Sequence, residues 1–146
     1  LSTAEYFNLE PCEMRVARWS DLEIGKGMGS STADIVAAAR ALSNAIGKEL
    51  NAGALASIAS KIESSDGSMY KGIVAFDQKS GRLVRRYPWW PQFVIVMLSP
   101  AQKLNTESAN FTGKHTYGKE FDEILSTLDQ AALNKDIRPF AAAATR

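Results

Sequence analysis

Apolar residues recur at helical spacing just after a glycine-rich segment of the chain. The stripe consists of Ile35, Ala38, Ala39, Leu42 and Ile46. Positions three and four apart share one face of a helix, so the stripe predicts an amphipathic helix. Gly47 stands where a C-terminal cap is expected, and the residue types that favour an N-cap are Ser30, Ser31 and Thr32. The helix should therefore begin at these hydroxyl residues and end before Gly47.

A second helix and a β-hairpin are predicted in the middle of the chain. Asn51 can cap a helix that ends near Ser64, and its apolar stripe is Leu55, Ile58, Ala59 and Ile62. The end of this helix leads into a loop that contains Ser65, Asp66 and Gly67. Residues 73–76 and 82–87 are rich in β-favouring types and flank a polar stretch that ends in glycine, which is typical of a hairpin.

Two further strands and a third helix complete the pattern. Residues 14–19 nearly alternate between apolar and polar types and predict a strand that leads into the glycine-rich segment. Residues 93–98 form a continuous apolar run between two prolines, which predicts a buried strand. A later helical stripe consists of Phe121, Ile124, Leu125, Leu128 and Ala132. This order of elements is typical of an α/β or α+β fold, and we assign the chain to the α+β class with a two-layer α/β architecture.

The polar, irregular stretch over residues 101–118 predicts a domain boundary. We assign residues 1–105 to a first domain and residues 106–146 to the beginning of a second. The chain starts without Met and stops within an alanine-rich helical pattern, so we expect it to be truncated at both ends.

Composition restricts the class of protein. The chain has 45% hydrophobic and 23% charged residues, which is ordinary for a globular protein. Its formal charge of +1 provides no basic field for nucleic acid. Cys12 is the single cysteine, so neither an internal disulfide nor a cysteine cluster for zinc can form. No apolar run reaches the ~18–20 residues of a membrane span, and we expect a cytoplasmic protein without membrane contact.

The glycine-rich segment is the strongest candidate for chemistry. Three glycines, Gly25, Gly27 and Gly29, alternate with other residues and are followed by hydroxyls at a helix start. Such a loop can turn its backbone N–H groups toward one phosphate, and the helix N-terminus adds further donors. Its spacing is neither GxxxxGK[ST] nor GxGxxG. The alternative is a glycine-rich turn that serves only the fold.

This segment resembles the phosphate-binding loop of the GHMP kinase superfamily. The loop of that family reads Pro-x-x-x-Gly-Leu-Gly-Ser-Ser-Ala-Ala, and here Gly27-Met28-Gly29-Ser30-Ser31-Thr32-Ala33 is in register with its second half. Residues 20–35 are similar to one branch, the L-threonine kinases associated with cobalamin synthesis. That branch also has an acidic segment, a Gly-Ile pair and a Phe-Asp pair, which correspond here to residues 63–66, 72–73 and 76–77.

The resemblance implies a fold. Its first domain would have the ribosomal-protein-like arrangement with a left-handed crossover, and its second would be ferredoxin-like. Glu23 and Ser64 stand where the family pattern has proline.

The resemblance also implies a reaction with ATP and Mg²⁺. The residues expected to hold the nucleotide are Gly25, Lys26, Gly27, Met28, Gly29, Ser30, Ser31 and Thr32. Ser31 is the expected magnesium ligand, and Glu63 could complete the magnesium shell. Asp66 matches the acidic position that faces the acceptor hydroxyl, where a carboxylate can take or orient the proton. The expected acceptor is a hydroxy amino acid, L-threonine first and homoserine second.

Several alternatives stay open at this point. Asp66 could belong to an ordinary Asp-Gly turn, and Glu63 could be a solvated charge. The protein could be another GHMP kinase, of homoserine or mevalonate type. It could also be a nucleotide-binding fragment without catalysis, which the departures at Glu23 and Ser64 would favour, or a purely structural domain. The oligomeric state is open, a homodimer included.

Overall fold

The computed structural model describes residues 3–10, 14–94, 96, 98 and 118–145. In these residues the elements are α1 (Thr3–Tyr6), α2 (Ser30–Ala45), α3 (Ala52–Ile62), β1 (Ile73–Asp77), β2 (Arg82–Tyr87), α4 (Lys119–Asn134) and α5 (Ile137–Ala144). Helices and a sheet occur together, so the α+β class is confirmed. The predicted boundary near residues 105 and 106 lies outside the described residues.

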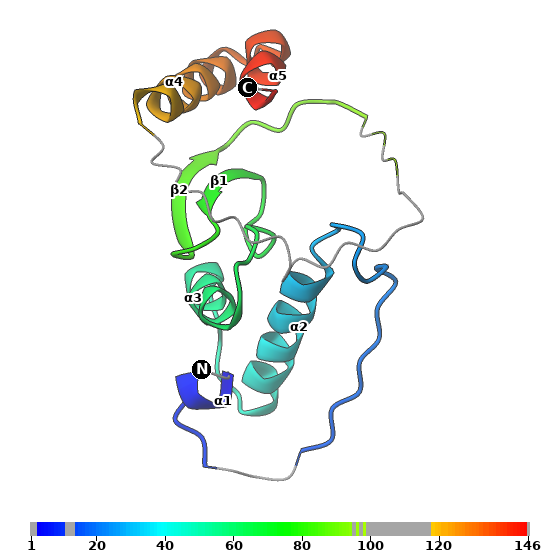
Figure 1. The fold of residues 1–146 in the computed structure, drawn as a ribbon. Coiled ribbons are helices and arrows are strands. Elements are labelled where there is room, and N and C mark those ends of the chain that lie inside the picture. The colour runs from blue at the N-terminus through cyan, green and yellow to red at the C-terminus, as the bar shows by residue number, and fades with distance from the viewer. Residues whose placement is uncertain (1–2, 11–13, 95, 97, 99–117, 146) are drawn as a thin grey trace.

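Helices α2 and α3 lie side by side and, with the segment that follows α3, form the main core (Figure 1). Its buried members are Ala39, Leu55, Ala56, Ile58, Ala59 and Met69. Four of them lie on α3, and they include Leu55, Ile58 and Ala59 of the predicted stripe. Ala39 of α2 is fully buried in this cluster.

The ends of these helices confirm two predicted caps and correct one. Gly47 has φ +65°, and its N–H donates to Asn44 O while Lys48 N–H donates to Ser43 O. This pair of bonds is a Schellman motif. Asn51 Oδ1 accepts from Ala54 N at 2.9 Å and caps α3.

The N-cap of α2 is Gly29, so the prediction that a hydroxyl residue caps this helix was wrong. Gly29 has φ +67°, a left-handed conformation that glycine adopts at little cost. The chain therefore enters the helix through a glycine turn, and Ser30, Ser31 and Thr32 all lie within the first turn.

Strands β1 and β2 form the predicted antiparallel hairpin, with Ile73 opposite Tyr87. Asp77 closes its loop by accepting from Lys79 N at 3.0 Å and from the Ser80 hydroxyl at 2.5 Å. The Ser80 bond and then the Lys79 bond lower the pKa of Asp77. Gly81 packs tightly on α3, because a Cβ at this position would lie 3.0 Å from Ala56 O. The hairpin is thereby held against α3.

Two predicted strands do not form in the described residues. Residues 14–19 are exposed, with Trp19 94% accessible, and have no strand partner. The predicted buried strand at residues 93–98 was also wrong at its described positions, since Val94 is 89% and Val96 82% exposed. β-Propensity describes how well a side chain fits a pleated, half-buried surface. A strand also requires a neighbouring strand to satisfy its backbone hydrogen bonds. Within the described part of the chain, β1 and β2 pair with each other and with no third strand.

Helices α4 and α5 pack on each other near β2 (Figure 1). Leu125 and Ala132 of the predicted stripe are buried. The Phe140 ring meets the rings of Tyr87 and Trp89 edge to face, at centroid distances of 6.2 and 5.7 Å. Burial raises the pKa of Tyr87. None of the helices described is long and apolar enough to cross a membrane.

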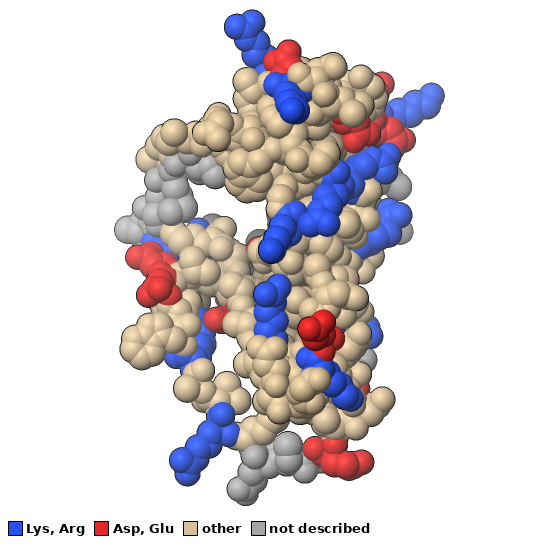
Figure 2. All heavy atoms as spheres, turned by 180° about the vertical axis from the view of Figure 1, so that it is seen from behind, with Lys and Arg blue, Asp and Glu red and all other residues tan. Residues whose placement is uncertain are grey.

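Charge on the surface is mixed. Basic side chains run in a band down the face opposite to that of Figure 1, with acidic side chains on either side (Figure 2). Strand β2 exposes Arg82, Arg85 and Arg86, and Arg85 forms an ion pair with Asp129 of α4 at 3.5 Å.

Candidate active site

The glycine-rich loop has three glycines in left-handed conformation and leads the chain to the N-terminus of α2. Gly25, Gly27 and Gly29 have φ angles of +77°, +70° and +67°. These alternate positions need glycine, because a side chain in this region of backbone space is strained. The first intrahelical bond of α2 runs from Ala33 N to Gly29 O, so the N–H groups of the preceding residues are not used within the helix. The loop and helix together can present backbone donors to a phosphate.

Asp66 lies directly against the last glycine of this loop. A Cβ built at Gly29 would clash with Oδ2 of Asp66, although the two residues are far apart in the sequence. At Gly27 a Cβ would meet no atom within 4 Å. The absence of a side chain at Gly29 therefore creates the space that the Asp66 carboxyl group occupies at the end of α2.

Asp66 is held on a tight turn between α2 and the hairpin. Its backbone N–H donates to Thr32 Oγ1 at 3.3 Å, and its Oδ1 accepts from Ser68 N at 2.9 Å. The following Gly67 packs on β1, because a Cβ there would lie 2.9 Å from a methyl group of Val74. These contacts fix the Asp66 backbone on both sides.

The residue before Asp66 ties the same turn to the hairpin loop. Ser65 is buried, and its N–H donates to Gln78 O at 3.3 Å. Its hydroxyl donates to Glu63 O at 3.1 Å, at the C-terminus of α3. The acidic turn is thus anchored to α2, α3 and β1 together.

The predicted ligands in the first turn of α2 differ in their exposure to solvent. Ser31 is exposed and Ser30 is half-buried, whereas Thr32 is only 2% exposed. In the loop, Lys26 and Met28 are half-buried. A ligand at the end of α2 can therefore reach Ser30 and Ser31 directly.

The side chains suit a magnesium ion that is held mainly by phosphates. Hydroxyl and carboxylate oxygens are the ligands that Mg²⁺ prefers, and it often uses only one or two of them besides nucleotide oxygens and water. Ser30 and Ser31 lie in the first turn of α2, the Asp66 carboxyl group lies against Gly29 at the N-cap of this helix, and Glu63 is exposed at the C-cap of α3. In the part of the chain that the structure describes, no three His, Cys, Asp or Glu residues form a metal cluster.

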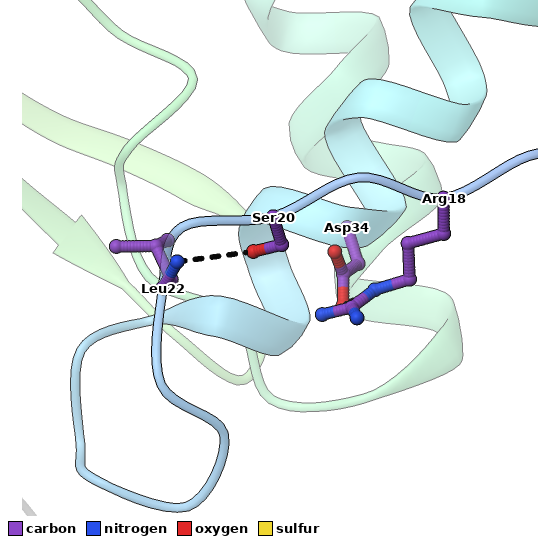
Figure 3. Close-up of polar contacts among 4 residues, drawn as sticks. All are labelled: Arg18, Ser20, Leu22 and Asp34. Carbon is purple, nitrogen blue, oxygen red and sulfur yellow. Dashed lines mark hydrogen bonds and ion pairs between the residues drawn. The ribbon is translucent and has the colours of Figure 1, made fainter.

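An ion pair ties the segment before the loop to α2 (Figure 3). Arg18 reaches Asp34 with both Nε and Nη2, each at 2.9 Å from Oδ2. The hydrogen bond and the charge of Asp34 raise the pKa of Arg18. Two residues further along, the Ser20 hydroxyl accepts from Leu22 N at 3.2 Å and turns the chain toward the loop. Both charged groups are partly exposed, so the pair directs the path of the chain more than it stabilises the fold.

Sequence reasoning found the loop and Asp66 but not the contacts that join them. Asp34 was interpreted only as an acidic residue suited to the N-terminus of the helix, and its pairing with Arg18 was not predicted, because nothing in the sequence signals a pair of opposite charges 16 positions apart. The alternating glycines and the match to the family loop identified Gly29, but neither indicates the neighbour that requires a glycine at this position.

Comparison with known proteins gives the family. Residues 1–76, just over half of the 146 residues, match the sequence model of the GHMP kinases N terminal domain. This region contains the glycine-rich loop, α2, α3 and Asp66. No solved structure matches the chain.

Two curated relatives are L-threonine kinases. The protein from Citrobacter freundii is 28% identical over 104 residues, which cover 71% of this chain and 36% of that protein. The protein from Salmonella typhimurium (strain LT2) is 37% identical over 89 residues, which cover 60% of this chain and 30% of that protein. The chain thus spans about a third of the length of these relatives. With the family match over its first half, it belongs to the GHMP kinases, which use ATP.

Proposed function

We propose that the protein transfers the γ-phosphoryl group of ATP to the hydroxyl of a small hydroxy amino acid, with L-threonine as the first candidate and homoserine as the second. The observation that carries the proposal is the position of Asp66, whose carboxyl group lies against Gly29 at the end of a phosphate-type loop. Membership of the GHMP kinases and the similarity to two L-threonine kinases support it.

The loop and the first turn of α2 bind the nucleotide phosphates in this proposal. Backbone N–H groups of residues 25–31 and the positive end of the helix dipole face the phosphate oxygens, and Lys26 adds a positive charge. Ser31, whose hydroxyl is exposed, would hold Mg²⁺ together with Ser30 and Glu63. Mg²⁺ supplies neutralisation of the charge that develops on the phosphates during transfer.

Asp66 acts on the acceptor. The acceptor oxygen forms a bond to the γ-phosphorus, the bond from that phosphorus to the bridging oxygen breaks, and ADP leaves. The hydroxyl proton passes to the Asp66 carboxylate, which its turn holds in place next to the phosphate-binding loop. The chain's own contribution is therefore positioning and proton acceptance.

The proposal extends to domain organisation and location. Residues 1–105 form the nucleotide-binding domain and residues 106–146 begin a second, ferredoxin-like domain. The described part of this second unit consists of α4 and α5, which pack on each other. ATP and free amino acids are abundant in the cytoplasm, where the proposed reaction would take place.

A thermal-shift measurement with a Ser31→Ala variant tests nucleotide binding. Ligand at about 100 times its Kd stabilises the folded state by about 2.7 kcal/mol, so Mg-ATP should raise the Tm of the full-length protein, and L-threonine should raise it further. Loss of the Ser31 hydroxyl should weaken Mg-ATP binding about 10-fold and so remove about 1.4 kcal/mol of this stabilisation.

The matched control is Ser126→Ala, at an exposed position of α4. This variant should keep the full shift. An identical Mg-ATP shift in Ser31→Ala and in the wild type would remove Ser31 from the binding site. No shift in any of the three proteins would contradict the nucleotide site itself.

A further inference from the structure

The hydroxyl of Thr32 is used differently from those of its two neighbours. Ser31 is exposed and Ser30 half-buried, but Thr32 is only 2% exposed and lies on the inner side of α2. A group buried to this extent is badly placed to exchange water for a phosphate oxygen or a magnesium ion. Its polar atom still needs a partner, because an unpaired buried hydroxyl costs free energy.

That partner is the turn that carries Asp66. Thr32 Oγ1 accepts the backbone N–H of Asp66 at 3.3 Å, across 34 positions of sequence. On its other side the turn is tied to the hairpin by the bond from Ser65 N to Gln78 O at 3.3 Å. Of the hydrogen bonds among the described residues, the Thr32 bond is the one that joins the Asp66 backbone to the helix of the phosphate-binding loop.

The Thr32 bond connects the position of the Asp66 carboxyl group to α2. The group occupies the space left by the missing side chain of Gly29, so a small shift of the turn moves it away from the loop. A catalytic group must lie within hydrogen-bond reach of the proton that it takes, and a displacement of about 1 Å can reduce the rate ~100-fold.

We propose that Thr32 is a positioning residue, which sets the distance between Asp66 and the bound phosphates, and that it does not bind the nucleotide itself. This inference rests on the proposed kinase function. It distinguishes Thr32 from Ser31, although the two residues are adjacent and both have hydroxyls.

Two variants of the full-length protein test this role. Thr32→Val keeps the shape of the side chain but removes the acceptor, and Thr32→Ser keeps the hydroxyl. We expect Thr32→Val to lower kcat about 10-fold or more with a change in the Kd of Mg-ATP below about two-fold, and Thr32→Ser to restore most of kcat. Thr127→Val is the matched control, because the Thr127 hydroxyl donates within α4 to Glu123 O; it should leave both constants unchanged.

Hydrogen exchange of the Asp66 amide provides a readout that does not depend on activity. Loss of a hydrogen bond worth about 1 kcal/mol should speed this exchange about five-fold in Thr32→Val, and Thr32→Ser should resemble the wild type. Unchanged exchange in Thr32→Val would overturn the inference. So would a Thr32→Val variant that keeps the wild-type kcat or that binds Mg-ATP about 10-fold more weakly at unchanged kcat, which would mark Thr32 as a direct ligand.

The two proposals can fail separately. An active wild type whose kcat is insensitive to Thr32→Val would overturn the positioning role and leave the kinase function standing. A wild type that binds Mg-ATP and transfers no phosphoryl group would overturn the kinase function, and with it the role of Thr32 in catalysis, even if the exchange of the Asp66 amide depends on Thr32.

Discussion

Asp66→Asn is expected to lower kcat of the full-length protein by about 100-fold or more, while the Kd of Mg-ATP changes by less than about three-fold. Asparagine has nearly the shape of aspartate, and its side-chain oxygen can still accept from Ser68 N. The bond from the backbone N–H of residue 66 to Thr32 is also retained. The variant therefore keeps the turn and removes the group that accepts the proton. Steady-state kinetics and nucleotide titration measure the two effects.

Asp77→Asn is the matched control for this variant. Asp77 also accepts hydrogen bonds from residues that follow it, at Lys79 and Ser80, but it lies at the end of β1, where the hairpin loop begins. Its replacement should lower the Tm slightly without changing kcat. Wild-type turnover in Asp66→Asn would remove Asp66 from the mechanism, and weak nucleotide binding at normal kcat would place it among the nucleotide ligands.

Gly29→Ala should be the second most damaging change. The new methyl group would occupy the place of the Asp66 carboxyl group, which must then rotate away from the end of α2. The φ angle of +67° adds strain of about 1–2 kcal/mol. We expect kcat to fall about 10-fold to 100-fold because the displaced carboxyl group no longer reaches the acceptor.

Gly27→Ala distinguishes the displacement of the Asp66 carboxyl group from backbone strain in the loop. Gly27 has a similar φ of +70°, but a Cβ there would meet no atom within 4 Å. Both variants should therefore lose similar stability in thermal unfolding, and only Gly29→Ala should lose most of its turnover. Equal kinetic defects in the two variants would show that the loop backbone matters rather than the position of Asp66.

Local patterns predicted much of the fold. The helical stripes of α2, α3 and α4 and the polar loop of the hairpin reflect local periodicity, and each of these elements is present. The caps at Gly47 and Asn51 were also predictable, because they depend on residue type and on bonds to nearby backbone groups. The predicted strand at residues 14–19 failed because pairing is a tertiary property.

In the candidate site, too, the tertiary contacts could not be predicted from the sequence. The resemblance to GHMP kinases identified Gly29, Thr32 and Asp66 one by one, and left the relation between them undefined. Only the packing of the acidic turn against α2 shows that Gly29 makes room for a carboxyl group and that Thr32 holds the turn. The roles of Ser31 and Glu63 at a magnesium ion stay predictions, since both side chains are exposed and depend on the nucleotide to complete a site.

The most direct test of the proposed function is to identify the product by mass spectrometry after the full-length protein is incubated with Mg-ATP and L-threonine. We expect O-phospho-L-threonine and ADP in equal amounts, and a matched reaction with Asp66→Asn should form both products about 100-fold more slowly or not at all. Formation of ADP without a phosphorylated amino acid, or no turnover with L-threonine or homoserine in a protein that binds Mg-ATP, would contradict it.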